Sequence, residues 1–168
     1  MSEPGSRREF LFRLGTGAGI AALGAQAIAS LRSLVPNVSY DAPTTVKLGP
    51  PGEFPDGLKF LPELRLFVFR EGNTFHAISA VCTHLGCTVR AEALPQALAK
   101  TVAGKPLRLT HRFLCPCHGS RYEGDGNNVS GPAPRPLTWY RLTAAADDGQ
   151  LVVDLAQPVD QAFRFTLA

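Results

Sequence analysis

The sequence predicts an all-β domain of the β-sandwich type, preceded by one N-terminal transmembrane helix. The run 14–31 contains no charged residue, as a membrane span requires. Beyond residue 45, short apolar and β-branched segments are separated by turn signals, which is the pattern of strands and hairpins. All four cysteines fall in two short loops among these segments. The predicted β-sandwich is therefore interrupted by loops that carry the chemistry.

Composition limits the classes of function. The chain has 168 residues, of which 45% are hydrophobic and 18% charged, and its net charge is +3. These values are those of a globular protein with one domain and at most an appendage. The charge is too small to indicate a nucleic-acid partner, and basic residues cluster only at the extreme N-terminus. We therefore expect no nucleic acid among the partners.

The N-terminus predicts an exported, membrane-anchored protein. Residues Ser6 to Leu11 (SRREFL) fit the twin-arginine export pattern, and the uncharged run 14–31 follows. The run is at the lower limit for crossing a hydrocarbon core of about 30 Å, and the arginines on its N-terminal side predict that this end stays in the cytoplasm. The small residues in 25–29 also leave a cleaved signal peptide open. We assign residues 1–35 to this signal or anchor.

A linker separates the anchor from the domain. Residues 36–44 are polar and flanked by proline, which is linker composition.

Strands are expected on both sides of the cysteine loops. Residues 65–69 and 74–81 form one predicted hairpin, with a tight turn at 71–73. Residues 139–143 and 151–155 form another through Asp148-Gly149, and 163–167 adds a closing strand. Histidines 76 and 111 lie in predicted strands outside the loops, so we expect both to pack or hydrogen bond rather than bind a metal.

The segment between the loops, 88–114, reads as an insertion. Residues 91–100 have helix-forming composition, with Pro95 suited to a first helical turn. A docking surface and a neutral surface loop both remain open for this segment.

The two cysteine loops predict a single metal centre. Their sequences are Cys82-Thr83-His84-Leu85-Gly86-Cys87 and Cys115-Pro116-Cys117-His118-Gly119-Ser120. Two Cys and two His could close a tetrahedral zinc site, but that leaves a pair of cysteines without a role. The alternative is a cluster of two irons and two sulfides in which two His replace two Cys on one iron. We favour this cluster because of the remaining pair of cysteines, one in each loop, and because of the residues around the loops.

These loops, with the second extended to Tyr122, resemble the two signature motifs of the disulfide-containing Rieske proteins of quinol-oxidising cytochrome bc-type complexes. The resemblance covers about 64–155. It implies a Rieske-type β-sandwich base over 45–168, with a small inserted cluster-binding subdomain at about 82–136. By the same resemblance Cys82 and Cys115 bind the inner iron of a [2Fe-2S] cluster, His84 and His118 bind the outer iron, and Cys87 bonds to Cys117.

Residues around the cluster are expected to tune it. The hydroxyls of Ser120 and Tyr122 can donate hydrogen bonds to a sulfide and to a thiolate, which favours the reduced state. Gly119 is expected to allow close backbone approach. Leu85 should lie at the tip near His118, and the resemblance implies that the proline-rich segment 131–136 covers the cluster.

The resemblance also implies a function. His118 would accept the hydrogen bond of a quinol while the cluster takes the first electron, and the head would swing about the hinge 36–44 to a c-type cytochrome. The implied setting is a dimeric multi-subunit complex with a cytochrome b-type subunit in a bacterial inner membrane. The anchor would be retained and the head periplasmic, where a disulfide persists. The alternative is the Rieske subunit of an exported molybdenum oxidase such as arsenite oxidase.

Overall fold

The computed structural model describes residues 6–35 and 44–167. The chain divides into two compact units, residues 1–42 and 43–168. The predicted linker 36–44 lies outside the described residues except at its last position.

The first unit contains a single helix, α1 (Arg7–Ser33). The side chain of Ser6 caps it by accepting a hydrogen bond from the Glu9 backbone N–H at 3.3 Å. None of its residues is buried. A helix of 27 residues is about 40 Å long, so α1 is long and apolar enough to cross a membrane. The predicted membrane-anchor helix is thus confirmed in length and composition.

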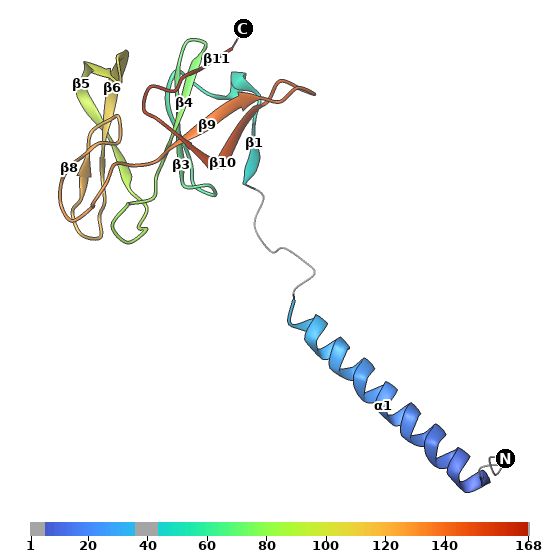
Figure 1. The fold of residues 1–168 in the computed structure, drawn as a ribbon. Helices are drawn as coiled ribbons and strands as arrows, with labels where there is room; N and C mark the ends of the chain where they lie inside the picture. The colour runs from blue at the N-terminus through green and yellow to red at the C-terminus, as the bar shows by residue number, and fades with distance from the viewer. Residues whose placement is uncertain (1–5, 36–43, 168) are drawn as a thin grey trace. The chain divides into compact units, whose positions relative to one another are not determined.

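The second unit is built on a curled antiparallel sheet of seven strands, with the order β1-β10-β9-β4-β3-β2 and β11 beside β4 (Figure 1). The strands are β1 (Thr45–Gly49), β2 (Gly57–Leu61), β3 (Leu66–Glu71), β4 (Thr74–Ser79), β9 (Trp139–Ala144), β10 (Leu151–Val159) and β11 (Phe165–Thr166), with a short 3-10 turn, η1 (Pro51–Glu53), before β2. We call this the base sheet.

Local sequence explains the two hairpins of the base sheet. Gly72 takes φ +59° in the turn between β3 and β4, and Gly149 takes φ +70° between β9 and β10. Glycine is favoured at both because it has no Cβ to clash in this conformation. The strands bury a cluster of apolar side chains that includes Phe75, Leu142 and Val153. The hairpins predicted from sequence are therefore confirmed.

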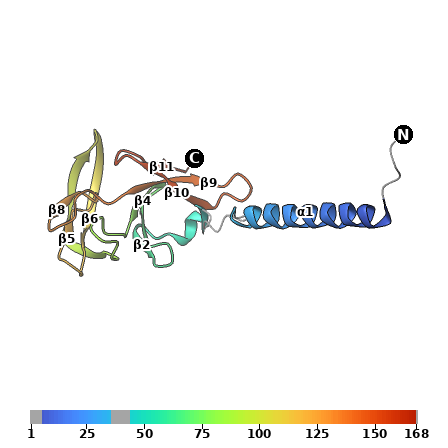
Figure 2. The ribbon, with the colours of Figure 1, turned by 60° about the horizontal axis from the view of Figure 1, so that its bottom comes forward.

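A second sheet lies beside the base sheet, and both views show it at one end of this unit (Figures 1 and 2). It has four strands in the order β5-β6-β7-β8, namely β5 (Arg90–Val102), β6 (Lys105–Leu114), β7 (Arg121–Tyr122) and β8 (Asn128–Ser130). We call it the cluster sheet because its strands flank the second cysteine loop. It is inserted in sequence between β4 and β9, which confirms the predicted all-β architecture.

The helical prediction for 91–100 is wrong, because this segment lies within β5. Its residues pair with β6, from Ala91 opposite Phe113 to Lys100 opposite Leu107. Pairing with a neighbouring strand outweighs the modest helix propensity of alanine and leucine. Pro95 is tolerated because it lies where the register shifts, between Ala93 and Leu98.

The two histidines outside the loops have packing roles, as expected. His76 is buried and stacks between Phe69 and Trp139, with ring centroids 4.7 Å away on each side. His111 meets Phe69 edge-on and lies 2.9 Å from the Thr110 hydroxyl through Nδ1.

The His76 stack predicts a loss of stability in acid. Burial, with a smaller contribution from Arg164, lowers the pKa of His76 to about 3. The unfolded chain therefore binds a proton at higher pH than the folded protein, so stability is full above pH ~6.5 and falls as the pH drops towards 3. At pH 4.5 the expected cost is about 2 to 3 kcal/mol. Urea unfolding at pH 7 and pH 4.5 measures it, and His76→Phe should remove most of this difference. An equal acid loss in that variant would assign the effect to other groups.

Candidate metal centre

The two cysteine loops share one backbone frame. In the first, the Cys82 N–H donates to the Cys87 carbonyl at 2.8 Å and the Gly86 N–H donates to the Cys82 carbonyl at 2.9 Å. In the second, the Cys115 N–H donates to the Ser120 carbonyl at 2.8 Å and the Gly119 N–H donates to the Cys115 carbonyl at 3.0 Å. These hydrogen bonds close each loop into a tight turn. Each turn carries one cysteine and one histidine of the predicted ligands, Cys82 with His84 and Cys115 with His118.

Glycine is needed at the same place in both loops. Gly86 takes φ +77° and Gly119 takes φ +73°. A Cβ at Gly119 would meet no atom within 4 Å, so among the described residues its positive φ accounts for glycine. The predicted close approach of Gly119 to the cluster stays a prediction.

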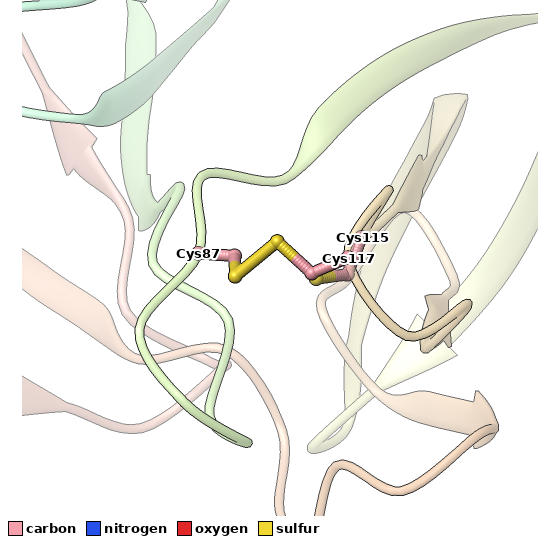
Figure 3. Close-up of side chains that lie close together, drawn as sticks. All are labelled: Cys87, Cys115 and Cys117. Carbon is pink, nitrogen blue, oxygen red and sulfur yellow. A yellow bond between two sulfur atoms is a disulfide. The ribbon is translucent and has the colours of Figure 1, made fainter.

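A disulfide joins the two loops. Cys87 bonds to Cys117 with a Cα–Cα distance of 6.6 Å, and Figure 3 shows the bridge passing from one loop to the other beside Cys115. The pairing that the family resemblance implied is confirmed. The sulfur atoms of these three residues lie within 4.8 Å of one another, but two of them are bonded together and cannot bind a metal as thiolates.

The remaining donor set fits an iron-sulfur cluster. Cys82 and Cys115 are free and buried, and both lie in the same apolar core cluster. The rings of His84 and His118 meet edge-on, with centroids 4.9 Å apart. The structure thus pairs two soft sulfur donors in the interior and two imidazoles further out, one pair for each iron of a Rieske centre.

The outer end of this site is open. His118 is exposed, His84 is half-buried, and the Leu85 side chain beside them is 70% exposed. The first loop is fixed to the residue that precedes β3 of the base sheet, because the Arg65 guanidinium donates to the Gly86 carbonyl at 2.7 Å. The imidazole pair is therefore held on a supported, solvent-facing tip.

The surroundings stabilise negative charge on Cys82. Burial raises the pKa of this thiol, but hydrogen bonds from the Tyr122 hydroxyl and the His84 N–H outweigh burial, so its pKa lies below the usual value. For Cys115, burial dominates and raises the pKa of the thiol. Burial and the neighbouring Cys82 also raise the pKa of Tyr122, which keeps this hydroxyl protonated as a donor.

The two predicted tuning residues lie at the cysteine sulfurs. The Tyr122 hydroxyl is 3.2 Å from Cys82 Sγ, and both residues are buried. Ser120 is also fully buried, it contributes to lowering the pKa of the Cys82 thiol, and its hydroxyl accepts a hydrogen bond from the Ala133 N–H at 3.2 Å. Ser120 thus joins the second loop to the proline-rich segment 131–136.

Sequence reasoning missed several contacts that hold this segment in place. The Thr83 hydroxyl donates to the Arg135 carbonyl at 2.6 Å, which ties the first loop to segment 131–136. Gly131 lies against Ser120 so closely that a Cβ would be 2.5 Å from the Ser120 Cα. The only signals in the sequence were a hydroxyl inside the first motif and a glycine at the start of the proline segment.

Comparison with known proteins gives a family match. The sequence matches the family described as "Rieske [2Fe-2S] domain" over residues 40–141, which is more than half of the chain. This range contains both cysteine loops and segment 131–136.

Curated relatives extend the match over most of the chain. An iron-sulfur subunit of the cytochrome b6-f complex from Chlorobaculum tepidum is 31% identical over 89% of this chain and 76% of its own length. The corresponding subunit of Chlorobaculum thiosulfatiphilum is 31% identical over 84% of this chain and 72% of its own length. Among solved structures, the plasma-membrane Rieske protein of Synechocystis PCC 6803 is 23% identical over 64% of this chain and 97% of that chain, with a TM-score of 0.40.

Proposed function

This chain belongs to the Rieske [2Fe-2S] family, and from that premise we propose that it takes an electron and a proton from quinol and passes the electron to a c-type cytochrome. As a family member it carries a Rieske [2Fe-2S] cluster and acts in electron transfer within a cytochrome bc-type complex. A zinc site is therefore set aside. The observation that carries the proposal is the imidazole pair at the supported tip, of which His118 is exposed and His84 half-buried.

We assign the ligands from the donor pairs of the site. Cys82 and Cys115, buried and adjacent, would bind the inner iron. His84 and His118, adjacent and further out, would bind the outer iron. The disulfide keeps both loops together around them.

His118 is the residue proposed to meet the quinol. When bound, the cluster supplies a one-electron carrier whose reduced state makes the imidazole ligands more basic. His118 is exposed, so the ring nitrogen that does not bind iron can accept the hydrogen bond of a quinol hydroxyl and then hold its proton. Leu85 supplies an apolar contact beside it for the quinol ring.

This coupling can be measured on the full chain with its cluster. The midpoint potential should fall at alkaline pH, by up to about 59 mV per pH unit for each proton taken up with the electron. Potentiometric titration between pH 6 and pH 10 measures it. A potential that stays flat over this range would eliminate proton-coupled oxidation of quinol at His118.

Tyr122 should raise the midpoint potential. Its hydroxyl contacts Cys82 Sγ at 3.2 Å, and a donor to this sulfur stabilises the more negative reduced state. Tyr122→Phe should lower the potential by about 60 mV, equivalent to about 1.4 kcal/mol for one electron. Ser120→Ala should lower it in the same direction. Tyr140→Phe is the matched control because Tyr140 packs against the apolar core of the base sheet. An equal fall of the midpoint potential in this variant would refute the tuning role of Tyr122.

The proposed location is a bacterial inner membrane with the head on the periplasmic side. Arg7 and Arg8 are the first two residues of α1 and fit a twin-arginine pattern, and arginines at this end favour a cytoplasmic N-terminus. The Cys87–Cys117 disulfide fits an oxidising compartment. We propose that α1 is retained as the anchor and that residues 36–44 act as the hinge between electron donor and acceptor.

The decisive experiment is purification of the tagged full chain from its native membranes. A cytochrome b-type subunit and quinol-dependent reduction of a c-type cytochrome are the expected results. Co-purification of a molybdenum subunit, as in an arsenite oxidase, without quinol activity would contradict the proposal.

A further inference from the structure

One face of the cluster sheet carries four exposed arginines. They are Arg90 on β5, Arg108 and Arg112 on β6, and Arg121 on β7. Residues directly opposite each other on paired strands share a face. Arg90 pairs with Leu114, which pairs with Arg121, and Arg112 lies two residues before Leu114 on β6. Arg108 lies further along β6 on the same side of the strand. We call this the arginine face.

The charge of the arginine face is largely uncompensated. Arg112 forms an ion pair with Glu92 at 2.8 Å, and among the described residues the other three arginines have no carboxylate partner within ion-pair distance. Lys100, on the opposite side of β5, is instead neutralised by Glu123 and by Asp125, the latter at 2.7 Å. Ion pairs thus neutralise Lys100 and Arg112, whereas Arg90, Arg108 and Arg121 have no such partner among the described residues.

An apolar groove borders this face. It has a volume of about 620 Å³, and Arg90 is one of the residues that line it. The apolar side chains along it include Leu58, Phe60 and Pro116, and Phe60 is 39% exposed. Cations beside exposed apolar groups are the composition of surfaces that rest in the headgroup region of a bilayer.

The anchor helix brings such a surface within reach. Residues 34–44 separate the end of α1 from the start of β1, and a chain of this length spans at most about 40 Å when fully extended. A bilayer crossed by α1 would therefore be available to the head at a high effective concentration.

We propose that the arginine face and its bordering groove dock the head on anionic phospholipid. The arginine guanidiniums would each contact lipid phosphate through paired N–H donors, and the groove would cover apolar carbon at the headgroup boundary. An acidic protein partner is the competing occupant. The groove favours lipid, because a purely electrostatic protein contact would not require exposed Phe60 in the same groove as Arg90.

The test uses the full chain, with its cluster, in lipid nanodiscs. A dye is attached at Thr101→Cys. Thr101 is exposed and lies on the same side of β5 as Ala99, which pairs with Arg108. Energy transfer from this dye to an acceptor on lipid headgroups reports how close the head lies to the bilayer. Transfer should be greater with phosphatidylglycerol than with phosphatidylcholine alone, and it should fall as salt is raised. Arg108→Gln should reduce the ratio of docked to free heads about fivefold.

Lys105→Gln is the matched control. It removes one charge from the same hairpin, but Lys105 pairs with buried Val102 on the inward side. This control should leave energy transfer unchanged. Equal transfer in the two bilayers, or equal losses in both variants, would overturn the proposal. It would also be overturned if Arg108→Gln slowed electron transfer to the co-purified cytochrome without changing lipid approach. The readout does not depend on quinol turnover, so it is independent of the proposed reaction.

Discussion

Gly131→Ala is expected to separate segment 131–136 from the second cysteine loop and to destabilise the protein by about 2 to 5 kcal/mol. Gly131 takes φ +89°, and a Cβ there would lie 2.5 Å from the Ser120 Cα and 2.9 Å from the Ser120 nitrogen. The clash is with backbone, so no side-chain rotation relieves it. The hydrogen bond from the Ala133 N–H to the Ser120 hydroxyl should break, and the midpoint potential should fall.

Gly149→Ala is the control that distinguishes the steric clash at Gly131 from the strain of a positive φ alone. Gly149 also has a positive φ, +70°, but a Cβ there would meet nothing within 4 Å. Its expected cost is about 1 kcal/mol, with no change in potential. Urea unfolding and redox titration of both variants measure the difference. Equal losses of stability in the two variants would mean that contact with Ser120 does not matter.

Removal of the disulfide should destabilise the protein by an amount comparable to that of Gly131→Ala. The double variant Cys87→Ser/Cys117→Ser should lose about 3 to 4 kcal/mol of stability, because the bond constrains an unfolded chain over a sequence separation of 30. The bond also joins the loops that carry the two donor pairs. The variant should therefore lose its cluster faster, which the decay of the reduced EPR signal at 37 °C measures.

Reduction and alkylation of the wild-type disulfide provide the control for this variant. This treatment breaks the same bond without introducing serine. It should reproduce most of the loss of stability. A stable cluster after reduction, together with an unstable double variant, would assign the loss to the serines instead of the bond.

Much of the architecture could be predicted from sequence where the signals were local. The hairpins β3–β4 and β9–β10 each carry a glycine at the turn, and their strands follow the predicted ranges closely. The disulfide was predicted only through the family resemblance, since spacing alone does not determine which cysteines pair. Strands β1 and β2 were not predicted in detail, because their short runs gain stability from the sheet they join.

Sequence-based predictions were wrong or missing where tertiary contacts determine the local structure. Residues 91–100 have helix-forming composition, yet they form half of a long hairpin because β6 supplies a paired strand. The contacts of Thr83 with Arg135 and of Gly131 with Ser120 join segments far apart in the sequence. No local pattern reports such contacts. The motifs indicated the chemistry of the site, whereas its supporting contacts required the fold.

The register shift in β5 has a consequence for solubility. β5 is the outer strand of the cluster sheet and has 13 residues, so one side of it offers backbone N–H and C=O groups to another chain. Pro95 has no N–H to donate, and it lies where the strand bulges between Ala93 and Leu98. This interrupts an otherwise continuous template near its middle. The arginine-rich hairpin is thereby protected against edge-to-edge aggregation with other copies of the chain at the high local concentrations of a membrane surface.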